Sequence, residues 1–211
     1  MEKLAEILIF YVHVPLGSLA LLTGAIALIA KKGSTIHKTS GKLFFFSMLI
    51  AAIASFVISV LPEHENPFLL GIGLFSTYFL ISGLRSLKLK QANFDPKWDR
   101  IVAFLIILIG FSMILYPILK SNSINIVLTV FGAVGIVFGF RDLKLLKNQE
   151  RMKKGWLKLH LGKMTGGYIA AVSAFFVVNE ILPGIWNWFV PGIVGSVFIT
   201  YWMMLLDKGK K

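Results

Sequence analysis

The chain has 211 residues, of which 56% are apolar and only 15% are charged, and its mean hydropathy is +0.78. Since a soluble domain carries about 25% charged residues, this composition excludes an ordinary soluble protein and predicts one embedded in lipid. The net charge of +12 does not indicate a nucleic-acid partner, because the basic residues fall between long apolar runs. We expect membrane lipids with anionic headgroups as the counter-charge. With no cysteine, disulfides and thiolate metal sites are excluded.

Seven apolar stretches are long enough to cross a bilayer as helices, which takes about 20 residues each. In chain order they are residues 7–30, 43–61, 68–87, 101–119, 124–140, 161–182 and 185–206. The predicted fold class is therefore an all-α integral membrane protein. We expect a single domain over residues 1–211, built as a bundle of seven transmembrane helices.

The basic residues predict the orientation of the bundle, since Lys and Arg near the ends of spans stay on the cytoplasmic side. Of the 22, 20 lie in residues 31–42, 85–100, 141–163 and 207–211, and the other two are Lys3 and Lys120. The turns at residues 62–67 and 183–188, by contrast, carry no Lys or Arg. The prediction is an N-terminus outside and a C-terminus in the cytoplasm, written N-out/C-in.

The longest predicted loop, residues 141–160, is basic and carries Leu145, Met152, Trp156 and Leu159 at near-helical spacing. This pattern is typical of an interfacial helix that rests its apolar side on anionic lipid. A loop that binds a protein partner is the alternative.

Small residues indicate where the helices pack, because lipid provides little hydrophobic drive between them. Their four-residue repeat in the sixth span predicts that this helix is central in the bundle. The residues concerned are Ala20 and Gly24 in the first span, Gly135 and Gly139 in the fifth, and Gly162, Gly166, Ala170 and Ala174 in the sixth. Pro15 and Pro191 lie inside spans and predict local kinks.

Ionisable groups inside a span are costly and mark candidate functional sites. His13 is the one clear case in the predicted spans. With Asn179 and Glu180 near the outer end of the sixth span, it predicts a polar pocket that binds a small molecule or ion. A neutral imidazole bonded to a neighbouring helix is the structural alternative. Each Asp and Glu lies near the end of a span, which disfavours a proton-coupled transporter but leaves a uniporter or channel.

His37 and His160 each precede an apolar span on the predicted cytoplasmic side. At matching depth, the two imidazoles could hold the iron of a b-type haem, or a divalent metal with Asp142 as a third ligand. In the plainer interpretation both side chains contact headgroups or cap helix carbonyls. The HExxH, HxxxH, GxSxG and P-loop motifs are missing, so an enzyme is not favoured.

The stretch YVHVPLGSLALLTGAIALIAKKGSTIHKTSGKLF, residues 11–44, resembles the opening of a bacterial family of polytopic membrane proteins, the domain of unknown function DUF2306. Residues 156–179 are similar to a second stretch of such proteins. The matching positions are His13, Gly17, His37, Gly41 and Lys42, then His160, Gly162, Met164 and Asn179. The resemblance implies a multi-pass protein of the bacterial inner (plasma) membrane and no particular activity.

The bundle is also superficially similar to cytochrome b561 proteins, which hold two haems through paired histidines on four helices. Since only His13 lies within a predicted span, two such pairs cannot form here. At most one haem, at the cytoplasmic edge, is compatible with the sequence.

Three functions follow as hypotheses. The first is a non-enzymatic protein that binds or transports a small molecule or ion near His13. The second is a membrane redox protein with a haem on His37 and His160, and the third is a metal-dependent hydrolase that uses these histidines and Asp142. The oligomeric state is open, with a homo-oligomer among the alternatives.

Overall fold

A computed structural model describes residues 1–209, and all the elements within this range are helical. They are α1 (Glu2–Ile7), the π-helical η1 (Leu8–His13), α2 (Val14–Ile29), α3 (Thr35–Val60), α4 (Pro67–Arg85), the short η2 (Ser86–Lys88), α5 (Lys97–Ser121), α6 (Ile126–Leu145), α7 (Gln149–Val178) and α8 (Trp186–Asp207). With α1, η1 and α2 continuous as one helix, seven helices in the described chain are long and apolar enough to cross a membrane. The predicted fold class is confirmed.

The helix that contains the sixth predicted span begins well before residue 161, because α7 starts at Gln149. Its first turns are basic, and polar side chains do not end a helix whose backbone hydrogen bonds are satisfied internally. Hydropathy alone marks only the part that is apolar on all sides.

The chain divides into two compact units that we describe separately. The first unit comprises Met1–Asn66 and Met164–Lys211, and the second comprises Pro67–Lys163. The boundary falls within α7, so that the basic start of this helix belongs to the second unit.

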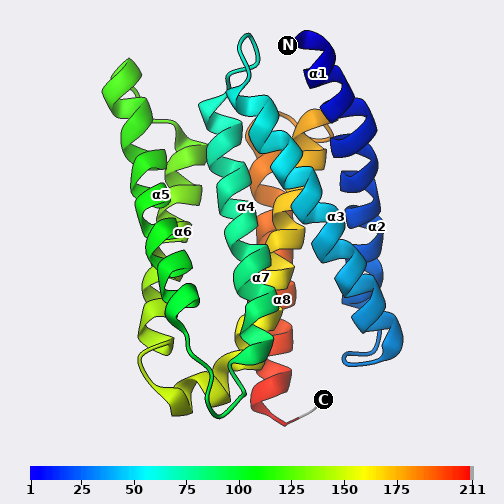
Figure 1. The fold of residues 1–211 in the computed structure, drawn as a ribbon, viewed down its shortest axis with the longest axis vertical. Coiled ribbons are helices and arrows are strands. Elements are labelled where there is room, and N and C mark those ends of the chain that lie inside the picture. The colour runs from blue at the N-terminus through cyan, green and yellow to red at the C-terminus, as the bar shows by residue number, and fades with distance from the viewer. Residues whose placement is uncertain (210–211) are drawn as a thin grey trace. The chain divides into compact units, whose positions relative to one another are not determined.

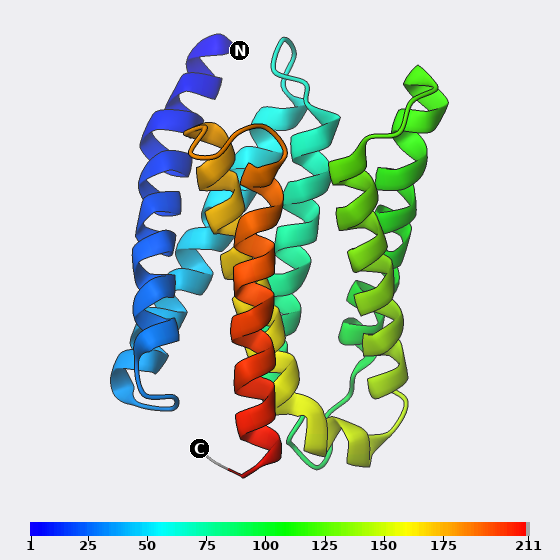
Figure 2. The ribbon, with the colours of Figure 1, turned by 180° about the vertical axis from the view of Figure 1, so that it is seen from behind.

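In the first unit, the α1–η1–α2 helix lies beside α3 (Figures 1 and 2). Gly24 is buried against the rings of Phe44 and Tyr168, which meet edge to face. The π-helical turns of η1 end at His13, two residues before Pro15. A proline ring collides with the carbonyl four residues earlier in a regular α-helix, and a π-helical turn offers more room there. The local distortion expected at Pro15 takes this form.

In the second unit, α5 and α6 lie side by side (Figure 1) and approach closely through glycines. A Cβ atom on Gly110 would lie 2.6 Å from the carbonyl oxygen of Gly132, and one on Gly139 would lie 2.7 Å from that of Ala103. The predicted packing role of Gly139 is confirmed. Gly110 and Gly132 perform the same role without having been singled out in the sequence.

The apolar side of the 141–160 segment packs inside the second unit. Met152 is 2% exposed and belongs to a buried cluster with Leu89 and Leu146. Leu145, Trp156 and Leu159 pack against this cluster. The expectation that these apolar side chains rest on lipid is therefore wrong, because segment 86–94 supplies an apolar surface of its own chain. The interfacial position of the segment stays a prediction.

Candidate functional site

Three polar side chains meet inside the second unit, each from a different helix. Tyr78 belongs to α4, Asp142 to the last turn of α6, and Lys163 to α7. Tyr78 is 4% exposed, Asp142 5% and Lys163 1%. We call these three residues the charged cluster.

The polar atoms of the charged cluster form a closed triangle. The Tyr78 hydroxyl donates to Asp142 Oδ2 at 2.6 Å, and Lys163 Nζ lies 2.9 Å from the same oxygen. Lys163 Nζ also donates to the Tyr78 hydroxyl. The carboxylate therefore receives two donors, and the ammonium ion has both a counter-charge and a neutral acceptor.

Aromatic rings enclose the ammonium group. Lys163 Nζ lies 4.1 Å from the ring centroid of Tyr78, 4.6 Å from that of Phe138 and 5.3 Å from that of Phe79. Distances below about 6 Å allow an attractive cation–π contact with each ring. Phe75 and Ile106 continue this apolar wall. The environment resembles a protein core, in which water cannot screen the charges.

The sequence did not identify this cluster. In the sequence, Lys163 falls among the basic residues of a predicted cytoplasmic loop, and Asp142 is a candidate only as a metal ligand. The expectation that His13 is the one clear ionisable group within a span is wrong, since α7 contains Lys163 well inside its length. Asp142 does lie near the end of its span as expected, but it is buried there. The available signal was one charge of each sign near a glycine, since Lys163 directly follows Gly162 and Asp142 lies three residues after Gly139.

A second ion pair in the same unit joins the end of α4 to the start of α5. Arg85 Nε and Nη2 donate to the two carboxylate oxygens of Asp99 at 2.9 and 2.7 Å. The side chains are 26% and 11% exposed. This pair has the parallel, two-bond geometry of arginine and carboxylate but remains within reach of solvent.

The three histidines near or within the spans share one bonding pattern, in which Nδ1 meets a backbone carbonyl. The partners are Ala51 for His13 at 2.9 Å, Ala27 for His37 at 2.9 Å, and Gly83 for His160 at 2.8 Å. A carbonyl oxygen can only accept, so Nδ1 carries the proton in each ring. A neutral ring in this tautomer has its lone pair at Nε2.

The first two of these bonds are reciprocal within the first unit. His13 reaches from η1 to α3, whereas His37 reaches from α3 to the last turn of α2. His37 and His160 both bond to carbonyls near helix ends, where four carbonyls lack intrahelical partners. The plainer interpretation of these two residues, carbonyl capping, describes what their Nδ1 atoms do.

The three residues expected to form the outer pocket, His13, Asn179 and Glu180, all belong to the first unit. His13 is half-buried, and its partner is the Ala51 carbonyl. Asn179 is exposed and donates to the Phe175 carbonyl at 2.8 Å. Glu180 lines an open hollow with residues 177, 181–184 and 187. A common pocket of His13, Asn179 and Glu180 stays a prediction.

The haem and metal hypotheses involve both units, because His37 belongs to the first and His160 and Asp142 to the second. A shared haem stays a prediction. Within residues 1–209, no three or more His, Cys, Asp or Glu side chains group as a metal site would require. Asp142 Oδ2 instead accepts from Tyr78 and pairs with Lys163.

Seven apolar helices with polar side chains buried among them define a multi-pass membrane protein. The model of the family described as "Predicted membrane protein (DUF2306)" matches residues 10–98, which is under half of the chain. The matched region includes His13, His37 and Tyr78, and the resemblance of the N-terminal stretch to this family is confirmed. The similarity of residues 156–179 lies outside the match. Searches of curated proteins and of solved structures found no match.

Proposed function

We propose that this membrane protein binds a small ion within its spans and moves it, that the ion is the proton, and that the charged cluster is the site. One observation carries the proposal: an ammonium and a carboxylate are in direct contact at 2.9 Å and both bond to one hydroxyl, in a nearly solvent-free part of a membrane-spanning unit. Transport of a small ion is the class of function expected from the sequence. The site differs from the pocket near His13, and the choice of the proton departs from the sequence analysis, which disfavoured proton-coupled transport.

Energetic considerations favour a functional reason for the cluster. Removing an ion from water costs several kcal/mol even in real proteins, and apolar residues of similar volume often replace a buried ion pair without loss of stability. Charged residues within membrane spans are for this reason candidates for ion pathways and proton relays. Stability alone does not require Asp142 and Lys163.

The packing of the cluster favours the proton over larger ligands. Lys163 Nζ lies within about 6 Å of the centroids of three aromatic rings and also contacts two polar partners. A metal ion or an organic ligand would have to displace these groups. A proton needs only to change places along hydrogen bonds that already exist.

A transfer cycle can be written with the atoms of the cluster. A proton that arrives at Asp142 Oδ2 neutralises the carboxylate, and the Lys163 ammonium, which has lost its counter-charge, releases one proton to an acceptor outside the cluster. The Tyr78 hydroxyl then donates its proton to the neutral Lys163 amine and accepts the proton of Asp142, which restores the carboxylate, the hydroxyl and the ammonium.

The predicted orientation, N-out/C-in in the plasma membrane of a bacterium, indicates the side of the membrane on which the cluster exchanges protons. The second unit then has its basic end, residues 141–158, at the anionic cytoplasmic leaflet. Asp142 lies in the last turn of α6, adjacent to this end. Protons would exchange with the cytoplasm on this side.

Proton flux into liposomes tests the proposal. The purified protein is reconstituted with a pH-sensitive dye inside, and a potassium diffusion potential drives the protons. We expect faster flux than in empty vesicles, and a loss of roughly tenfold or more in Asp142→Asn and Lys163→Met. Asp99→Asn, which alters the other ion pair, is the matched control and should keep the flux. Wild-type vesicles that are no faster than empty ones would overturn the proposal.

His13→Ala in the same assay tests the alternative location of the site. A small-molecule or ion pathway through His13, Asn179 and Glu180 requires that this variant lose flux while Asp142→Asn keeps it. The opposite result would assign the flux to the charged cluster.

A b-type haem on His37 and His160 is the second candidate function. It is favoured by the bond from each Nδ1 to a carbonyl, since histidine ligands commonly donate their other nitrogen in this way and direct Nε2 to the metal. The test is an absorption spectrum of protein from haem-replete cells, oxidised and dithionite-reduced. A Soret band that disappears in His37→Ala/His160→Ala supports a redox protein, and a featureless spectrum excludes it.

A further inference from the structure

We infer that His160 is the group that passes protons between the charged cluster and the basic end of the second unit. The inference rests on the proposed function and adds a residue to it, the point of exchange with solvent. Three observations carry it: the position of His160 on α7, its burial, and its bond to α4.

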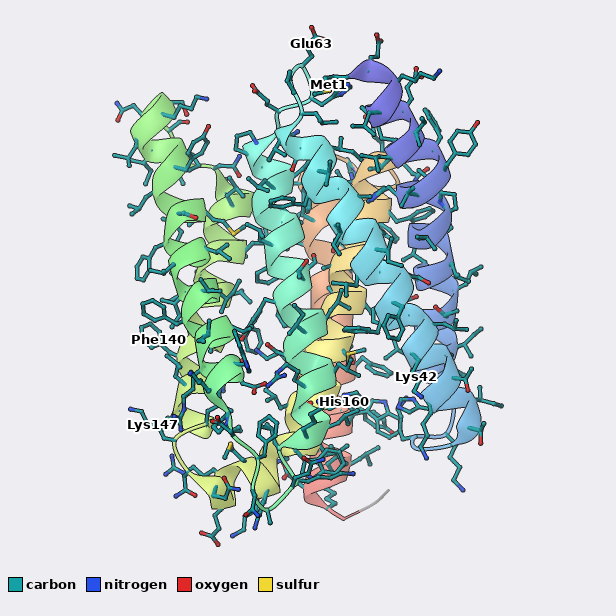
Figure 3. All side chains as sticks on the ribbon, in the orientation of Figure 1. Met1, Lys42, Glu63, Phe140, Lys147 and His160 are labelled. Carbon is teal, nitrogen blue, oxygen red and sulfur yellow. The ribbon has the colours of Figure 1, made fainter. Side chains whose placement is uncertain are left out.

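His160 lies nearer to the basic end of the unit than Lys163 does. His160 precedes Lys163 by three residues on α7, so the two side chains share a helix face with Cβ atoms about 5–6 Å apart. It also lies about 4.5 Å nearer to the N-terminal end of α7 along the axis. In Figure 3 the labelled His160 and Lys147 both lie in the lower half of the view, toward the basic end of the unit.

His160 is more exposed than Lys163, as is required of a residue that exchanges protons with solvent. Lys163 is almost fully buried, whereas His160 is half-buried. The turns that precede His160 carry exposed basic residues, among them Arg151, Lys153 and Lys154. His160 therefore lies at the level on α7 where the exposed, basic part gives way to the buried part.

The bond to α4 fixes the chemical state of the ring. Nδ1 donates to the Gly83 carbonyl at 2.8 Å, and the buried Ser86 hydroxyl donates to the same oxygen at 2.7 Å. Because Nδ1 keeps its proton, Nε2 is the nitrogen at which a neutral ring gains and a charged ring loses a proton. The proton count balances, since each proton that Nε2 accepts from solvent leaves it for the cluster, or the reverse. Imidazole performs such shuttling near neutral pH.

The same bond ties His160 to the helices that build the cluster. Gly83 and Tyr78 both belong to α4, and His160 and Lys163 both belong to α7. The titratable and charged groups that these helices and α6 bring to this part of the unit are Tyr78, Arg85, Arg141, Asp142 and Lys163. Among them, only the charged cluster combines acid and base groups away from solvent.

His37 provides a matched control within the chain. It makes the same Nδ1 bond to a carbonyl near a helix end, at 2.9 Å, but it belongs to the first unit. A structural loss from breaking a histidine–carbonyl bond would appear in both variants. A loss of proton exchange should appear only at His160.

The test is proton flux of the full chain in liposomes over about pH 5 to 8, with His160→Gln, His37→Gln and Asp142→Asn. Glutamine can still donate to the carbonyl but cannot shuttle protons. We expect His160→Gln to lose roughly tenfold in flux and to regain part of it when imidazole is added to the buffer. His37→Gln should keep the wild-type rate.

Three results would overturn the inference. If His160→Gln conducts like wild type while Asp142→Asn does not, the exchange role is wrong and the cluster remains the site. If His160→Gln is slow but imidazole does not restore it, or its melting temperature falls while that of His37→Gln does not, the role is structural. If wild-type vesicles show no flux, the proposed function itself fails and the inference with it.

Discussion

The two ion pairs of the second unit join the same kinds of charge in opposite surroundings. Arg85 and Asp99 make two parallel bonds at 2.9 and 2.7 Å and keep 26% and 11% of their side chains exposed. Lys163 and Asp142 make a single contact at 2.9 Å, with side chains 1% and 7% exposed. The pair with the better geometry lies where charges are least costly. Good hydrogen-bond geometry alone therefore does not identify a functional ion pair. Burial of both charges, which costs free energy of desolvation, is the better indicator.

Removing one charge of the buried pair should have the largest effect. Asp142→Ala leaves the Lys163 ammonium without its counter-charge among aromatic rings, and we expect a loss of about 3–5 kcal/mol in the free energy of unfolding. Unfolding in detergent, followed by circular dichroism, measures this loss. A loss below that of Asp99→Ala would mean that solvent reaches Lys163, which contradicts the comparison.

Removing both charges should separate stability from function. In Asp142→Leu/Lys163→Met no buried charge is left unpaired, so we expect most of the stability of the single variants to return. Proton flux should stay lost, because no group remains to carry the proton. A double variant that conducts would exclude the charged cluster as the site, whatever its stability.

Tyr78→Phe should have an intermediate effect. The ring and its contact with Lys163 remain, but Asp142 loses one of its two donors, and such a loss costs about 1–3 kcal/mol when the group is buried. Flux should also fall, since the hydroxyl links Asp142 and Lys163. Tyr116→Phe, at a partly exposed site outside the cluster, is the control and should change neither quantity.

The sequence predicted the spans well because hydropathy over about 20 residues is set by lipid and not by neighbouring helices. It misplaced the start of α7, whose first turns carry exposed charges on one side and bury Met152 on the other. The same limitation concealed Lys163. A lysine three residues after His160 counts as a loop charge until the packing of α7 against α4 and α6 is known.

The candidate site was beyond sequence reasoning for a related reason. Tyr78, Asp142 and Lys163 are separated by more than sixty and by twenty-one positions in the chain, and no spacing rule connects them. The histidines were easier, because the polar edge of a span indicates them directly. The sequence could predict that these histidines bond to carbonyls at helix ends, but it could not predict which residues carry those carbonyls.

Weakening the partly exposed pair, Arg85 and Asp99, should have the smallest effect of the four changes. Asp99→Asn removes a negative charge from the first turn of α5 and weakens the contact with Arg85, and interactions within reach of solvent contribute about 1 kcal/mol or less. Because salt screens charges near solvent, the difference between this variant and wild type should shrink as the salt concentration rises. The difference for Asp142→Ala should persist, since ions do not enter the cluster. If both differences respond equally to salt, the two pairs share one environment, and burial no longer distinguishes the candidate site.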